Sequence, residues 1–191
     1  MEIDIPDSEL KRIGHDFTKL VKEPSERSAI IVLSARIESL VEDATEHLFQ
    51  GLSFSSHQRR LDGLRSIDVI DDQIFQILKA LAAIRNHYAH SYDDCTLKDP
   101  KIIDRVRNFF AARDVLFQAT RDKKQFEEGF TDQLAAQRVM SMPAWFTSNL
   151  NELFATFIVL APYLLALARL PVSRPPKLSW GSFMIRPLVT V

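Results

Sequence analysis

The chain has 191 residues, of which 46% are hydrophobic. That is enough to form the core of one domain, and it excludes a disordered chain. The formal net charge is −1 and the isoelectric point is about 6.5, which excludes the strongly basic surface of proteins that coat long duplexes. A local basic site for nucleic acid is still possible. The chain has a single cysteine, Cys95, so no disulfide and no CxxC pair can form within it.

We expect Cys95 to be an ordinary loop thiol in a reducing compartment, since no His or acidic partner is specified for it. The acidic N-terminal segment lacks the pattern of a signal peptide. These observations predict a cytoplasmic protein.

Helices are favoured over strands, because glycine is scarce and no segment alternates apolar and polar residues for long. Ser25 is predicted to cap one helix, and Asp71 or Asp72 to cap another. Asp99 followed by Pro100 is a typical helix start. The predicted helices cover about residues 7–21, 25–49, 57–67, 71–91 and 100–110. We expect an all-α bundle forming one domain over residues 1–170.

The C-terminal third contains a long apolar helix, which we expect to begin at Pro143. Residues 153–168 carry no charge, but a membrane span needs about 20 apolar residues, and Pro162 interrupts this run. We therefore expect a helix buried on several sides and no membrane association. The pattern is weak over 111–141, where we expect a charged, exposed cluster. The tail, 171–191, has four prolines and is predicted to be extended and docked.

The side chains best suited to binding or catalysis are concentrated at the end of the helix predicted over 71–91. Arg85 lies seven residues after Leu78 and so borders the apolar stripe, and Asn86 and His90 are four residues apart on one face. His87 and Tyr88 are their neighbours and further binding candidates. The buried stripe of this helix is predicted to comprise Ile74, Ile77, Leu78, Leu81, Ile84 and Tyr88.

Two interpretations of this cluster are open. In the functional one, Arg85 holds a phosphate oxygen, His90 acts as general acid or base on a ribose 2′-hydroxyl, and Asn86 orients the phosphate. One imidazole cannot easily be both acid and base in one step, so catalysis would require a homodimer with its sites at the interface. In the structural one, Arg85 pairs with Glu38 or a loop aspartate. Asn86 and His90 then close the end of the helix.

Outside this segment the sequence offers little. Glu38 flanks an apolar stripe and is a binding candidate, although a solvated carboxylate is the simpler interpretation. Arg59 and Arg60 lie on a basic helix that is either a phosphate-facing ridge or a solvated face. The chain has no glycine-rich phosphate loop, no GxSxG and no Glu-x-x-His, so we expect no metal and no cofactor. Nor does any DNA-reading helix follow a helix–turn pair.

The segment Ile84-Arg85-Asn86-x-x-Ala89-His90 resembles the Arg-polar-x-x-x-His signature of HEPN domains. Residues 27–110 more particularly resemble the mannitol repressor family, through the stretches ARIESLVEDA, SFSSHQRRLDGL and IRNHYAH and a helix that starts at Asp-Pro. The resemblance implies an all-helical, usually dimeric bacterial regulator that acts through protein or nucleic-acid contacts. The alternative it implies is a metal-independent ribonuclease or toxin that cuts RNA with Arg85, Asn86 and His90 and has an antitoxin as partner.

Overall fold

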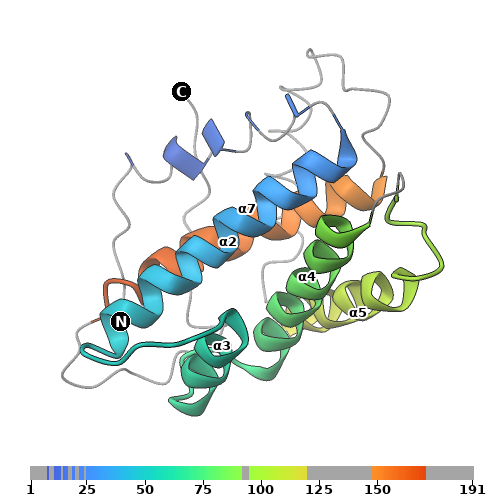
Figure 1. The fold of residues 1–191 in the computed structure, drawn as a ribbon. Coiled ribbons are helices and arrows are strands. Elements are labelled where there is room, and N and C mark those ends of the chain that lie inside the picture. Colours follow the sequence, from blue (N-terminus) through green and yellow to red (C-terminus); the bar gives the residue numbers. More distant parts are fainter. Residues whose placement is uncertain are drawn as a thin grey trace.

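Every regular element in the described part of the chain is an α-helix, as Figure 1 shows. The computed structural model describes residues 25–91, 95–119 and 148–170, together with residues 8, 11–13, 15, 16, 19, 22 and 23. The helices are α2 (Glu26–Leu48), α3 (His57–Ser66), α4 (Asp72–His90), α5 (Ile103–Ala119) and α7 (Ser148–Leu167). The predicted all-α class is therefore confirmed for this part.

Helix α2 is the central element. Ser25 begins it as predicted: its side chain accepts a hydrogen bond from the backbone N–H of Ser28, and the Ser28 hydroxyl satisfies the backbone of Ser25 in return. Because α2 packs against α3, α4 and α7, it buries residues on several sides. Figure 1 shows α2 and α7 running alongside each other. The fully buried side chains of α2 include Ala29, Ile30, Leu33, Leu40, Val41 and Ala44.

Helix α4 carries the candidate site and packs on α2, α3 and α5. Asp71 is its N-cap and accepts a 2.8 Å hydrogen bond from the backbone N–H of Ile74. The predicted buried stripe is confirmed, since all of its members are buried: Ile74, Ile77, Leu78, Leu81, Ile84 and Tyr88. This packing fixes which residues at the end of α4 face outward.

Helix α5 begins later than predicted. Asp99, Pro100, Lys101 and Ile102 form a turn, and the α-helix starts at Ile103. The Asp99 side chain accepts the Lys101 N–H at 2.8 Å, and its carbonyl accepts the N–H groups of Ile102 and Ile103, so Asp99 caps the turn that leads into α5. The helix continues beyond 110, where the apolar pattern weakens, to residue 119.

Helix α7 packs on α2, and its described side chains are almost all buried, among them Phe154, Phe157, Leu160, Leu164 and Leu167. Pro162 lies inside it. The Tyr163 hydroxyl donates to the Val69 carbonyl, and the His47 ring nitrogen Nε2 lies 2.6 Å from the Leu170 carbonyl. Among the helices described, none is long and apolar enough to cross a membrane.

Several sequence-based predictions fall outside the described residues. They are the start of the last helix at Pro143, most of the weakly patterned segment 111–141 with its charged cluster, and the tail 171–191. In the N-terminal segment, predicted to be helical over 7–21, the described residues include Ile13, which is buried, and Asp16, which pairs with Arg36 at 2.9 Å.

Candidate functional site

Arg85 stands at the edge of the core, as its spacing predicts. Its side chain is half-buried, and its Nε atom is buried with no hydrogen-bond partner. Its Nη1 atom donates to the Asn86 side-chain oxygen at 3.1 Å. No ion pair joins Arg85 to Glu38 or to any other acidic residue that the structure describes. Within the described residues, the guanidinium therefore has no counter-charge in direct contact.

Asn86 and His90 are exposed, and neither closes the helix. Ser91 does so, because its backbone N–H and its hydroxyl both donate to the His87 carbonyl, at 3.0 and 2.8 Å. The structural interpretation assigned this role to Asn86 and His90. The capping hydrogen bonds come from Ser91 instead, while His90 lies in the last turn of α4, where a basic side chain is favoured. Both side chains are available to a ligand.

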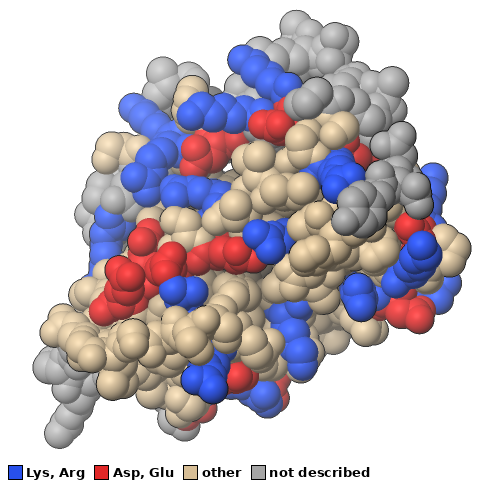
Figure 2. Space-filling model, viewed as in Figure 1, with Lys and Arg blue, Asp and Glu red and all other residues tan. Residues whose placement is uncertain are grey.

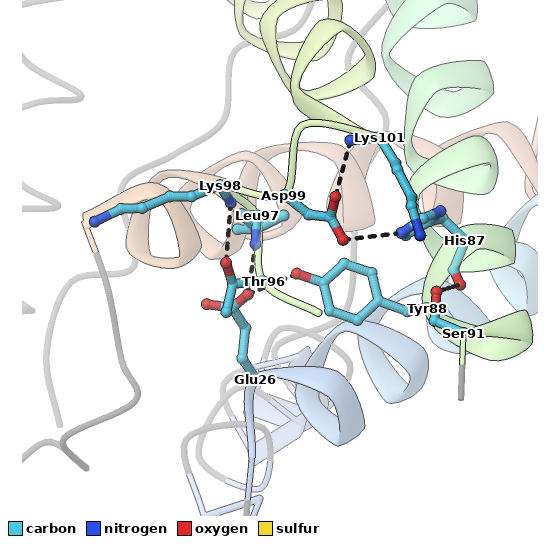
Figure 3. A network of polar contacts seen from close by, with 9 residues as sticks. All are labelled: Glu26, His87, Tyr88, Ser91, Thr96, Leu97, Lys98, Asp99 and Lys101. Carbon is cyan, nitrogen blue, oxygen red and sulfur yellow. Dashed lines mark hydrogen bonds and ion pairs between the residues drawn. The ribbon is translucent and has the colours of Figure 1, made fainter. Parts of the chain in front are cut away.

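Tyr88 points the opposite way, into the protein. Its hydroxyl donates a 2.6 Å hydrogen bond to Glu26 Oε1, and the same oxygen accepts the Leu97 N–H at 2.7 Å (Figure 3). Burial, and then this hydrogen bond to the carboxylate, raise the pKa of Tyr88 well above its ordinary value. Tyr88 thus fastens the end of α4 to the start of α2 and to the segment after Cys95. It does not face a ligand, although the sequence made it a binding candidate.

His87 belongs to the same inner side of the helix. Its Nε2 atom lies 3.6 Å from Asp99 Oδ2, which is an ion-pair distance and too long for a good hydrogen bond (Figure 3). The Lys101 N–H, and after it His87, hold the pKa of Asp99 below its ordinary value. His87 therefore tethers the turn before α5, a different role from the one that its place in the motif predicts.

A second group of charged side chains lies where α2, α3 and α4 meet. His57 is the first residue of α3, and its Nδ1 atom is buried without a partner. Burial lowers the pKa of His57, the charge of Glu38 raises it, and the charges of Arg60 and Arg85 lower it. The structure thus brings Glu38 and Arg60, both binding candidates, into the neighbourhood of Arg85. His57 was missed, because in sequence it only begins a short basic helix.

The two predicted basic residues of α3 differ in surroundings. Arg60 pairs with Glu42 of α2, whereas Arg59 is exposed and has no ion pair among the described residues. Figure 2 shows acidic side chains gathered over the C-terminal half of α2, with Lys or Arg side chains next to them. The predicted basic ridge is therefore partly neutralised, and Arg85 is the less compensated cation.

The described residues give little support for a metal site or for a reactive thiol. No group of three or more His, Cys, Asp or Glu side chains there is arranged to hold a metal ion. Cys95 is buried and its pKa is raised by that burial, so it is a weak nucleophile.

The site thus combines a poorly compensated guanidinium with an exposed amide and an exposed imidazole one helical turn apart. A second, half-buried imidazole lies within its electrostatic reach. Donors of this kind suit an anionic ligand with several oxygens. Comparisons with protein-family models, with curated proteins and with solved structures find no match to this chain.

Proposed function

We propose that this chain is an HEPN-like, mannitol-repressor-like regulatory protein that binds RNA through a phosphate held at Arg85. The observation that carries the proposal is the half-buried guanidinium, which has no acceptor at Nε and no carboxylate in contact among the residues that the structure describes. A charge in partial burial without a partner is costly, and such groups are normally paired or coordinated. A bound anion would remove that cost.

A phosphodiester, with one negative charge shared by two non-bridging oxygens, fits this arrangement. The planar guanidinium can donate two parallel hydrogen bonds to phosphate oxygens. Among the described residues its Nε has no acceptor, and its Nη1 donates to the neutral Asn86 oxygen, which orients the group without cancelling its charge. Phosphate contacts alone do not read sequence. The formal net charge of −1 argues against coating a long duplex, so the proposed partner is an RNA contacted locally.

RNA cleavage is the second candidate function, and the exposure of His90 favours it. In this reaction an imidazole takes the proton of a ribose 2′-hydroxyl and the 2′-oxygen attacks phosphorus. The bond to the 5′-oxygen then breaks, and an acid returns a proton to that oxygen. Arg85 would stabilise the charge on the phosphorane oxygens. The dimer that the sequence predicts would provide a second His90, from the other chain.

Binding is tested by fluorescence anisotropy with a labelled single-stranded RNA, comparing the native protein with Arg85→Ala. Losing a charge-assisted bidentate contact should weaken binding roughly 10- to 100-fold. Arg107→Ala is the matched control, because this arginine of α5 is 72% exposed and its ion pair, with Asp104, lies on the surface. Equal affinities of the native protein and Arg85→Ala would refute the proposal.

Cleavage is tested separately by incubating total RNA with the native protein, Arg85→Ala and His90→Ala. The catalytic candidate predicts decay with the native protein alone. Decay at the same rate in all three would assign the cleavage to a contaminant and remove the catalytic claim, while leaving the binding claim to the anisotropy experiment.

A further inference from the structure

We propose that a single strand of RNA lies along the exposed face of α4, with Lys79 as a further phosphate contact beside Arg85. The inference rests on the proposed function and deepens it, since it names another binding residue and the form of RNA that the site takes. Lys79 lies on the same helix as the Arg-polar-x-x-x-His motif but outside it.

One face of α4 is open over the second half of the helix. Residues at intervals of three and four form a stripe along this face: Lys79, Ala83, Asn86 and His90. Lys79, Asn86 and His90 are exposed, and Ala83 is partly exposed. Because the side chain of Ala83 is only a methyl group, no bulky side chain of the stripe separates Lys79 from Asn86. An extended ligand can therefore follow the stripe.

A direct contact joins this stripe to Arg85. Asn86 belongs to the stripe, and its side-chain oxygen accepts the 3.1 Å hydrogen bond from Arg85 Nη1. Lys79 lies about 10 Å along the helix axis before Asn86. Its ammonium lies 5.9 Å from the centre of the Phe75 ring, one turn further from Asn86. Lys79 and Arg85 therefore contact different phosphates of the strand.

The charges of α4 favour an anionic ligand along this face. Over residues 73–90 the helix has no aspartate and no glutamate, and its permanently charged side chains are Lys79 and Arg85. Lys79 forms no ion pair with a carboxylate that the structure describes. The face thus carries positive charge that α4 itself does not compensate, which is complementary to a phosphate backbone.

The surroundings of Lys79 add to this positive charge. The Arg65 guanidinium lies 4.7 Å from the centre of the same Phe75 ring, so two cations share one aromatic side chain. Asp72 pairs with Arg65 at 2.7 Å and compensates that charge. The ammonium of Lys79 is therefore the cation of this pair that is available to a phosphate.

A single line of donors suits one strand better than a duplex. A duplex presents two phosphate backbones across a groove, whereas the stripe offers one row of groups along one helix. Sites for single strands commonly combine a cationic path along the backbone with rings on which bases stack. The exposed imidazole of His90 provides such a ring at the end of the stripe. The form of RNA that fits is therefore an unpaired strand.

The test is the salt dependence of binding to a labelled single-stranded RNA of about eight nucleotides, measured by anisotropy. Each phosphate contact to a single strand contributes about 0.7 to the slope of log affinity against log salt, because binding releases counterions. Lys79→Ala should weaken binding roughly two- to fivefold at low salt and reduce the slope by about 0.7. Lys79→Arg, which keeps the charge, should restore both.

Lys98→Ala is the matched control. Lys98 is an exposed lysine in the turn before α5, and Figure 3 shows its side chain extending away from His87 of α4. This variant should leave the affinity and the slope unchanged. A loss equal to that of Lys79→Ala would show that any surface lysine contributes as much, and would overturn the inference.

A shorter ligand separates the two contacts. A mononucleotide has one phosphate, which Arg85 holds, so an NMR titration should show weaker binding to Arg85→Ala and unchanged binding to Lys79→Ala. Weaker mononucleotide binding to Lys79→Ala would contradict two separate phosphate contacts.

The outcomes distinguish this inference from the proposed function. If Arg85→Ala weakens RNA binding but Lys79→Ala changes neither affinity nor slope, the strand does not follow α4, and the proposed function stands. If Lys79→Ala lowers both but Arg85→Ala has no effect, the strand lies on α4 and the anchoring at Arg85 fails. If Lys79→Ala changes the mass found by light scattering and leaves the slope intact, a second copy of the chain covers this face, and the inference is overturned.

Discussion

At the scale of residues, two side chains of the motif region that are two positions apart have different surroundings and roles. Tyr88 is fully buried and bonded to Glu26, whereas Asn86 is exposed and contacts Arg85. The helical spacing predicts this division, because Tyr88 continues the apolar stripe. The spacing does not reveal Glu26 as its partner, because a glutamate in the first turn of a helix is ordinarily expected to be solvated, and this one is only 7% exposed.

Removing the Tyr88 hydroxyl should therefore destabilise the protein more than removing a comparable hydroxyl elsewhere. Tyr88→Phe takes one of two hydrogen bonds from a buried carboxylate and should cost about 1.5–3 kcal/mol of unfolding free energy. Tyr163→Phe is the control, since its hydroxyl donates to the neutral carbonyl of Val69 and should cost about 0.5–1.5 kcal/mol. Urea denaturation measures both. A smaller loss for Tyr88→Phe than for Tyr163→Phe would contradict the role given to Glu26.

Asp99 provides a pH prediction at the same scale. Because its folded-state pKa is lowered from 3.8, its contribution to stability is present above about pH 3.8 and is lost as the pH falls through the lower folded value. An NMR titration of its carboxyl group should show a midpoint below 3.8. The midpoint should rise in His87→Gln but stay lowered, since the Lys101 N–H is the larger cause. A midpoint at or above 3.8 in the native protein would contradict the cap at Asp99.

At the scale of elements, the sequence predicts caps and apolar stripes better than contacts between helices. The start of α2 at Ser25 and of α4 after Asp71 follow from local chemistry. The start of α5 does not: Asp-Pro predicts a helix from residue 100, but a turn held by the Lys101 and Ile102 N–H groups on Asp99 comes first. Nor could His57 be identified from the sequence, because the charged groups that act on it lie on α2 and α4 as well as on its own helix, and no local pattern connects them.

The cap of α4 can be tested on its own. Asp71→Ala removes the side chain that accepts the Ile74 N–H and should lower the unfolding free energy by about 0.5–2 kcal/mol. Asp72→Ala is the matched control. The neighbouring Asp72 forms a surface ion pair with Arg65, so its loss should cost about 0–1 kcal/mol. Thermal or urea unfolding of the two variants compares them. A larger loss for Asp72→Ala would show that the helix begins elsewhere.

At the scale of the whole molecule, the all-α class follows from the sequence because apolar periodicity, scarce glycine and helix caps agree with one another. The interior of the bundle also follows from sequence, since an uncharged run such as that in α7 has to be buried on several sides. Assembly does not follow in this way, because a surface that pairs with another copy need not differ in composition from the rest of the protein.

The homodimer remains a prediction, and it can be measured directly. Multi-angle light scattering should give twice the chain mass of 21.9 kDa across a range of protein concentrations. The reason is chemical: if RNA is cleaved, one His90 cannot easily be both acid and base, so two chains have to contribute. A mass of one chain at all concentrations, with RNA cleavage retained, would contradict the dimeric site.

The most direct test of the central claim is urea unfolding of native protein and Arg85→Gln, each with and without single-stranded RNA at about 100 times the native dissociation constant. Without RNA the variant should be at least as stable as the native protein, because Arg85 has no ion-pair partner among the described residues to leave unpaired and its replacement removes a partly buried charge. With RNA the native protein should gain about 2.7 kcal/mol and the variant much less. An equal gain for both proteins, with the variant already destabilised without RNA, would show that Arg85 supports the fold and does not bind phosphate.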